Sequence, residues 1–171
     1  PLVEQSDYQL GVDVLLRRSF DGGQTWDPTP LVNEGGGHPV PIVDQQTGGI
    51  LLAIGDMRNQ LIVLQSNDDG DTWSEVASYD TDAVKRDDWL MSTTSTCHGI
   101  QLRTGRLMVP CYHQMSRQKI AEGSHVRGSH VMYSDDHGET WTVGDEIAPR
   151  TEECTVLESH DVRVYVNMRR H

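Results

Sequence analysis

Short runs of aliphatic and β-branched residues, separated by polar turns, recur along the whole chain. They occupy residues 40–43, 50–54, 61–65, 107–112 and 130–133. Apolar runs of this length, bounded by turn-forming residues, are typical of β-strands. The pattern therefore predicts an all-β fold made of short strands.

An eight-residue pattern is repeated three times between these runs. It reads Ser-x-Asp-x-Gly-x-x-Trp, with Thr directly before Trp, and spans residues 19–26, 66–73 and 134–141. Ser and Asp side chains can accept hydrogen bonds from backbone N–H groups across a turn, Gly allows a positive φ, and Trp can pack on the next strand. Each copy predicts a hairpin that joins two antiparallel strands.

The strands between the copies predict the blades of a β-propeller, because each interval holds four short strands in the same order. We assign blades and half blades as follows: half blade 1–33, blade 34–80, blade 81–149 and half blade 150–171. The chain would then cover about three four-stranded antiparallel blades. Since closure takes at least about four blades, we expect it to be part of a longer propeller.

The copies begin 47 and then 68 residues apart, and the first interval is a normal blade length. The excess in the second interval falls on two polar segments, 80–96 and 114–128. We expect both to be long loops, which is where binding residues often lie on a rigid β scaffold.

The acidic second copy does not match a calcium loop of the EF-hand type. With Gly70 at the sixth position of such a loop, the first and third ligands would be Gln65 and Asn67. The histidines are scattered without the spacing of metal ligands. We expect neither a metal ion nor another cofactor.

Composition excludes two classes of partner. The 171 residues carry 14 Lys and Arg against 26 Asp and Glu, a net charge of −12 with no basic block, which argues against nucleic acid. The longest aliphatic run is far shorter than the roughly 20 residues of a membrane helix, so no membrane span is expected. Three scattered cysteines predict buried thiols rather than a disulfide scaffold and fix no compartment. The oligomeric state is equally open.

The repeated pattern is the Asp-box, or bacterial neuraminidase repeat, and the chain resembles the exo-α-sialidase family of glycoside hydrolases. The segment 5–19 is similar to the stretch in which a loop Asp precedes a strand ending in Arg-Ser. The segment 152–158, EECTVLE, resembles the family's Asn-Glu-Cys/Ser-Gln-Val-x-Glu motif. The segment 164–169, VYVNMR, resembles its Leu-Leu-Asn-x-Arg strand. The resemblance implies a parent propeller of six blades.

The resemblance also implies roles for particular residues. Asp7 takes the place of the acid/base, and Glu153 that of the base which activates a tyrosine nucleophile. Glu152 is the alternative base, but the Cys that follows Glu153 matches the motif. Arg169 takes the place of one arm of the arginine triad. The other two triad arginines and the tyrosine match no position of this chain, so we expect the chain alone to be inactive.

These residue types suit the chemistry of sialic acid, which carries a carboxylate on its anomeric carbon. Arginine pairs with a carboxylate through two parallel hydrogen bonds and keeps its charge. A neutral phenol as nucleophile avoids the repulsion that an anionic carboxylate would meet. A Glu is then needed to take the phenol proton, and an Asp to protonate the leaving oxygen.

His38 begins a His-Pro-Val-Pro turn, and in sialidases the corresponding turn borders the sugar pocket. His38 is therefore a candidate substrate contact. A purely structural role in the turn is an equally good interpretation. The resemblance implies hydrolysis of terminal α-sialic acid, with retention, from glycans, glycoproteins or glycolipids. These motifs do not indicate which sialic acid linkage is preferred, or whether the sugar is transferred to water or to another acceptor. Because Asp-boxes also occur in other propellers, the alternative is a non-catalytic module that binds carbohydrate or protein.

Overall fold

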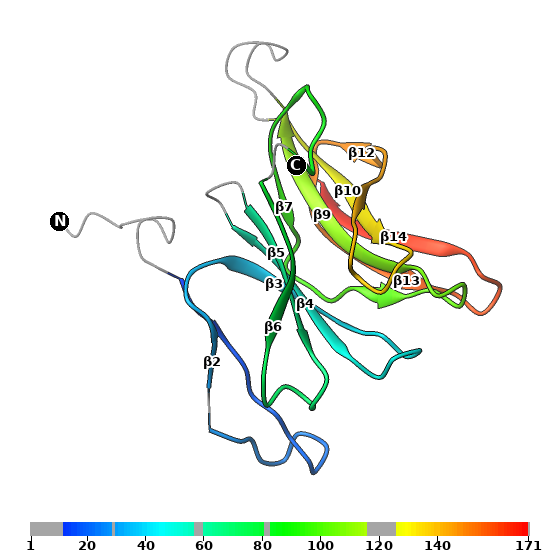
Figure 1. Ribbon diagram of the computed structural model, residues 1–171. Helices are drawn as coiled ribbons and strands as arrows, with labels where there is room; N and C mark the ends of the chain where they lie inside the picture. Colours follow the sequence, from blue (N-terminus) through cyan, green and yellow to red (C-terminus); the bar gives the residue numbers. More distant parts are fainter. Residues whose placement is uncertain (1–11, 29, 57–59, 81–82, 116–125, 171) are drawn as a thin grey trace.

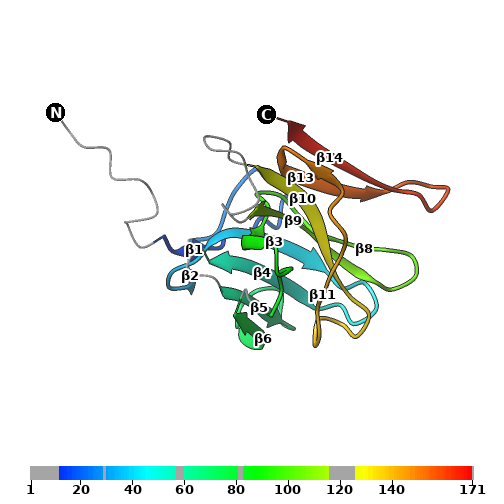
Figure 2. The ribbon, with the colours of Figure 1, turned by 90° about the horizontal axis from the view of Figure 1, so that it is seen from above.

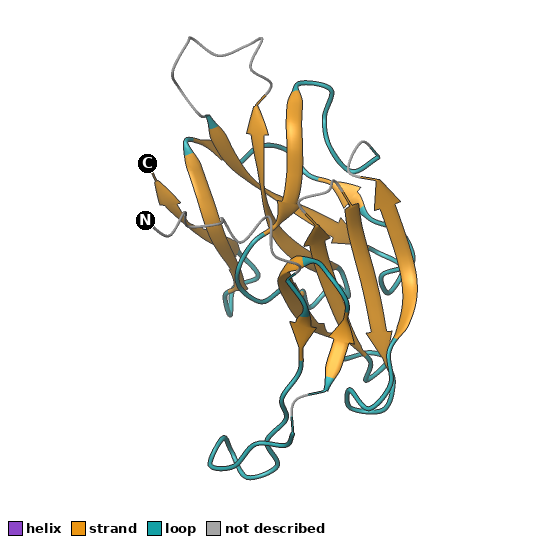
Figure 3. Ribbon diagram, turned by 90° about the vertical axis from the view of Figure 1, so that its left-hand side faces the viewer, coloured by secondary structure: helices purple, strands orange, loops and turns teal. Residues whose placement is uncertain are grey.

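A computed structural model describes residues 12–28, 30–56, 60–80, 83–115 and 126–170 of the chain. In these residues the regular secondary structure consists of strands, which are joined by turns and loops (Figure 3). The all-β prediction is confirmed. Within the same residues no helix is long and apolar enough to cross a membrane.

The strands form antiparallel sheets that follow one another in chain order and fan outwards (Figures 1 and 2). The first sheet pairs β1 (Val14–Leu15) with β2 (Leu31–Asn33). The second has four strands in sequential order, β3 (Gly37–Val43), β4 (Ile50–Asp56), β5 (Gln60–Ser66) and β6 (Ser74–Asp80). This is the meander expected of one propeller blade.

The third sheet is built around two long strands, and the fourth is a single hairpin. The third sheet consists of β7 (Trp89–Thr94), β8 (Ile100–Gln101), β9 (Leu107–Met115), β10 (Arg127–Ser134), β11 (Thr142–Val143) and β12 (Ala148–Pro149). The fourth pairs β13 (Thr151–Glu158) with β14 (Val164–Arg170). The first strands of the last three sheets lie side by side, since β3 contacts β7 and β8, and β8 contacts β13.

The prediction of a loop over residues 80–96 is wrong in its second half. β7 pairs with one end of β9 and β8 with the other, so together they form the interrupted first strand of the third sheet. The polar residues that made this segment look like a loop are buried in the contact between sheets, as for Ser92, Thr93 and Thr94.

Each Asp-box folds as the sequence predicts. In the second copy Ser66 Oγ donates to Asp68 Oδ1 over 2.8 Å and accepts from Gly70 N over 2.8 Å. The Thr72 hydroxyl donates to Asp68 Oδ2 over 2.6 Å, and bonds from Thr72 and Ser66 lower the pKa of Asp68 to about 2. The other two copies repeat these bonds, so the carboxylates serve as turn acceptors.

The tryptophans of the boxes pack less uniformly than expected. Trp141 is buried in the main core and Trp73 packs against a smaller cluster. Trp26 is 55% exposed, so the packing prediction is wrong there. Its sheet consists of the two short strands β1 and β2, and Trp26 belongs to neither of the two hydrophobic clusters.

The main core lies between the second and third sheets. It joins buried residues of β3, β4 and β5 to others of β9 and β10, among them Ile42, Leu51, Val63, Val109 and Met132. Cys111 and Cys154 are buried and all three cysteines are free thiols, as predicted for the first two. Burial of aliphatic side chains between sheet faces stabilises the stacking of one blade on the next.

Different polar contacts connect each pair of neighbouring sheets. Arg18, after β1, pairs with Asp71 in the second box and donates to the carbonyl of Asp69 over 3.1 Å. His137 in the third box lies 2.7 Å from a buried carboxylate oxygen of Asp44, after β3. Arg103 donates to the Ser159 carbonyl over 2.7 Å, which ties the third sheet to the turn between β13 and β14.

Candidate functional site

Two consecutive glutamates of β13 share one arginine of β14. Arg169 Nη1 lies 2.7 Å from Glu153 Oε2, and Arg169 Nη2 is paired with Glu152 Oε1. Glu152 is buried, whereas the side chains of Glu153 and Arg169 are 41% and 53% exposed. One guanidinium therefore joins a buried carboxylate to one that is open to solvent.

A break in the strand explains why both glutamates reach the same side. Successive residues of a regular strand point to opposite faces, which would separate Glu152 from Glu153. The register of β13 against β14 shifts between Glu152 and Thr155, and Glu153 has a φ of +49°. A non-glycine residue in this region costs roughly 1 kcal/mol or more, and such strain is concentrated at functional sites.

Arg127, at the start of β10, pairs with the other oxygen of Glu152. Its guanidinium carbon also lies 5.7 Å from the centre of the Tyr112 ring, within the range of a cation–π contact. Tyr112 is buried on β9. The sequence did not point to Arg127, because it lies in the segment 114–128 that was expected to be a loop.

His38 meets this group from the second sheet. Its Nδ1 lies 3.1 Å from the Thr94 carbonyl oxygen, and the Thr94 hydroxyl donates to the His38 carbonyl over 2.6 Å. The His38 and Tyr112 rings are 5.8 Å apart between centres, and the Tyr112 hydroxyl lies 3.5 Å from Nδ1. His38 also has a positive φ of 52°. The two hydrogen bonds between His38 and Thr94 thus hold the turn at His38 in place.

A continuous set of contacts thereby runs across three sheets at one end of their first strands. It contains His38, Tyr112, Arg127, Glu152, Arg169 and Glu153, in that order. The structure brings together three of the four predicted site residues, since Glu153 and Arg169 are paired and His38 belongs to the same set. The fourth, Asp7, lies outside the described residues.

Two positive and two negative side chains make up the polar part of the site. Exposed guanidinium N–H groups beside a half-exposed carboxylate can bind an anion and take up a proton from a neighbouring group. Among the residues that the structure describes, no cluster of three or more His, Cys, Asp or Glu side chains could hold a metal ion.

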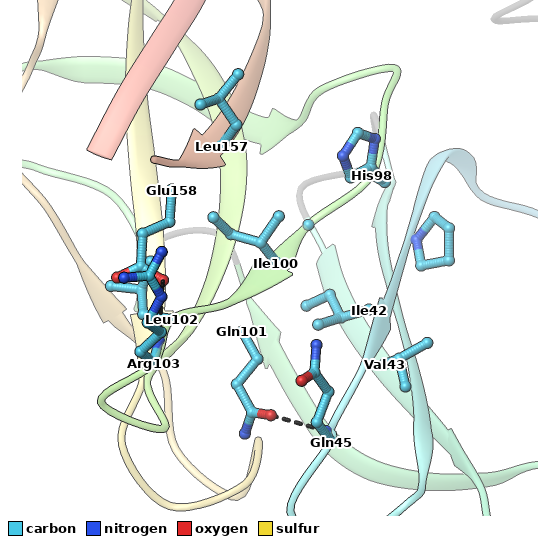
Figure 4. A pocket seen from close by; sticks show the side chains of 12 residues that line it. Ile42, Val43, Gln45, His98, Ile100, Gln101, Leu102, Arg103, Leu157 and Glu158 are labelled. Atoms are coloured by element: carbon cyan, nitrogen blue, oxygen red, sulfur yellow. Dashed lines mark hydrogen bonds and ion pairs between the residues drawn. The ribbon is translucent and has the colours of Figure 1, made fainter. Parts of the chain in front are cut away.

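A cavity of about 670 Å³ lies at the opposite end of the same first strands (Figure 4). Ile42, Gln101, Arg103, Leu157 and Glu158 are among the residues that line it. Leu157 is about 13 Å along β13 from Glu153, at roughly 3.3 Å per residue. The cavity is therefore separate from the acid–arginine site.

The sheets, the Asp-box hairpins and the acid–arginine group define a β-propeller of the Asp-box class. The family of BNR repeat-like domains matches residues 8–171. The chain belongs to this family and, within it, to the exo-α-sialidase family of BNR-repeat propellers, as the motifs predicted.

Several proteins of known sequence or structure are similar to this chain. A sialidase of Bacteroides fragilis is 28% identical, covering 95% of this chain and 34% of the relative, and mouse Sialidase-3 is 33% identical, covering 85% and 41%. The structure of Hadza microbial sialidase Hz136 aligns with a TM-score of 0.76 at 26% identity, over 92% of this chain and 36% of the other. Trypanosoma rangeli sialidase in complex with sialic acid shares the fold, with a TM-score of 0.59 at 18% identity over 91% and 29%. The chain thus spans about two fifths or less of each of these proteins.

Proposed function

We propose that this chain contributes part of the active site of a sialidase-type glycoside hydrolase, which releases terminal α-linked sialic acid from glycoconjugates with retention. The observation that carries the proposal is the double pairing of Arg169 with Glu152 and Glu153 at a strained break in β13. The half blades 1–33 and 150–171 and the blades 34–80 and 81–149 would form part of a six-bladed ring.

In this proposal Arg169 binds the carboxylate of sialic acid. The guanidinium is half exposed, and a sugar held by it would lie beside the carboxylate of Glu153, with which it is paired.

The reaction would run in two displacements. Glu153 takes the proton of the family's nucleophilic tyrosine, the phenol oxygen bonds to the anomeric carbon, and the glycosidic C–O bond breaks. Asp7 gives its proton to the leaving oxygen. Asp7 then takes a proton from water, whose oxygen displaces the tyrosine, and Glu153 returns the phenol proton. His38 would border the sugar, held by its bonds to Thr94.

The test is the release of a fluorogenic sialoside by the complete six-bladed parent protein and by its Glu153→Gln variant. We expect the substitution to lower kcat by about 10²- to 10⁴-fold, the usual contribution of a general base. Glu75→Gln, an exposed glutamate of β6, is the control and should keep the wild-type rate. The configuration of the sugar first released, followed by NMR, tests retention. Wild-type rates in Glu153→Gln would refute the assignment, and sialoside binding without turnover in the wild type would favour a binding module.

A further inference from the structure

Glu152 is a buried carboxylate that is clamped between two arginines from different strands. It is 3% exposed, with Arg169 of β14 on one oxygen and Arg127 of β10 on the other. The proposed reaction gives it no step. A carboxylate removed from water is costly unless it is well paired, and here each oxygen has a guanidinium partner.

Only a carboxylate can satisfy both arginines from this position. A Gln or Asn side chain offers one carbonyl oxygen and one NH₂ group, and that NH₂ would face N–H donors of an arginine. One of the two guanidiniums would lose its acceptor and meet a donor instead. A neutral isostere at residue 152 therefore removes the clamp while keeping the volume of the side chain.

The clamp determines where the guanidinium of Arg169 points. An arginine side chain that is 53% exposed would otherwise sample many rotamers, and ordering it costs conformational entropy. Glu152 holds Nη2, which leaves Nη1 directed at Glu153. Arg127 is held on the same carboxylate, so the two positive groups lie on either side of it.

We infer that Glu152 is a positioning residue, which fixes Arg169 for the substrate carboxylate and places Arg127 beside it as a second cation. This inference rests on the proposed function. Glu152 does not touch the reacting atoms, so its loss should weaken binding of the sialoside more than it slows the chemical step. An interaction of this kind, made equally in ground and transition states, appears in KM rather than kcat.

Glu158 supplies a matched control on the same strand. It accepts from the backbone N–H of Arg103 over 3.0 Å at the far end of β13, so Glu158→Gln also weakens a link between the third and fourth sheets. A purely structural role for Glu152 predicts the same kinetic outcome for both substitutions.

The experiment compares Glu152→Gln, Glu152→Asp and Glu158→Gln in sialoside kinetics, with each substitution made in the complete six-bladed parent protein. We expect Glu152→Gln to raise KM at least 10-fold with kcat within about 3-fold of wild type, Glu152→Asp to restore part of the KM, and Glu158→Gln to leave KM unchanged. An unchanged KM in Glu152→Gln, or an equal change in Glu158→Gln, would overturn the inference.

A second measurement does not depend on turnover. ¹⁵N NMR of the arginine side chains should show slowly rotating Hη groups for Arg169 and Arg127 in the wild type, and faster rotation in Glu152→Gln. Identical Hη exchange in the two proteins would overturn the inference. If the complete six-bladed parent shows no sialidase turnover, the proposed function fails, and the NMR comparison still decides whether Glu152 immobilises the two arginines.

Discussion

Gly55 lies where the second sheet touches the third, and replacing it tests the close approach of the two. A Cβ atom at this position would lie 2.2 Å from Thr93 Oγ1 and 2.6 Å from the backbone N of Thr94, well inside ordinary contact distance. The Gly55 N–H also donates to Thr94 Oγ1 over 2.9 Å. Gly37, which is paired with Gly55 across β3 and β4, has no such neighbour, because the nearest atom to its Cβ would be 3.9 Å away.

We expect Gly55→Ala to destabilise the protein by about 2 kcal/mol. Forcing a methyl group into a packed contact costs roughly 1–3 kcal/mol, and the loss of the bond to Thr94 adds about 1 kcal/mol. The lower entropy of the unfolded alanine chain offsets roughly 0.4–1 kcal/mol of this. At about 2–4 °C per kcal/mol for a chain of this size, Tm should fall by roughly 4–8 °C.

The assay is thermal and urea unfolding followed by circular dichroism, with Gly37→Ala as the matched control. Gly37→Ala makes the same chemical change in a paired strand residue and should leave Tm equal to or slightly above that of the wild type. An unchanged Tm in Gly55→Ala would refute the close approach of the sheets. An equal fall in Tm in both variants would show that the effect comes from the backbone preference of alanine and not from the contact between the sheets.

Three further outcomes follow from individual side chains. Burial lowers the pKa of His113 and of His130, so the unfolded chain binds more protons than the folded one below about pH 6.5. The free energy of unfolding should therefore fall as the pH drops from 7.5 to 5.5. The same free energy of unfolding at both pH values, measured with urea, would contradict this. Burial alone would raise the pKa of Asp44, but hydrogen bonds from a histidine, a backbone N–H and a glutamine lower it to about 2. Its contribution should be present above about pH 4 and lost as the pH falls towards 2, and Asp44→Asn should flatten that limb of the acid unfolding curve. Asp136→Ala removes bonds in the third box and should cost about 1–2 kcal/mol, measured by urea unfolding, whereas Asp21→Ala in the exposed first box should cost less.

The fold could be predicted wherever local chemistry alone determines it. An Asp-box needs only its own eight residues, and Ser66, Asp68, Gly70 and Thr72 make their bonds within that segment. β7 was missed because its polar side chains are buried where two sheets meet, as when Thr94 bonds to Gly55 and His38. Contacts of this kind depend on which sheets lie against each other, and the spacing of hydrophobic residues in the sequence does not predict that.

The site could be predicted only in part, for a similar reason. The motif at residues 152–158 and Arg169 identified two residues that the fold pairs directly. The alignment to the motif left Glu152 as the alternative to Glu153, whereas the break in β13 turns both towards one arginine. Arg127 reaches Glu152 from a strand outside any recognised motif, so its part in the site depends on the stacking of the third and fourth sheets.

The contacts between neighbouring sheets have a consequence for how such a ring can evolve. Arg18 with Asp71, His137 with Asp44, and Arg103 with the Ser159 carbonyl are three unlike couplings, each with its own donor and acceptor. The Asp-boxes of the three sheets are nearly alike, but the contacts between neighbouring sheets are not. A blade that is duplicated or recombined into another position of the ring would lack the matching partner residues on its new neighbours. Gene duplication can therefore supply new blades only if compensating substitutions arise at both borders.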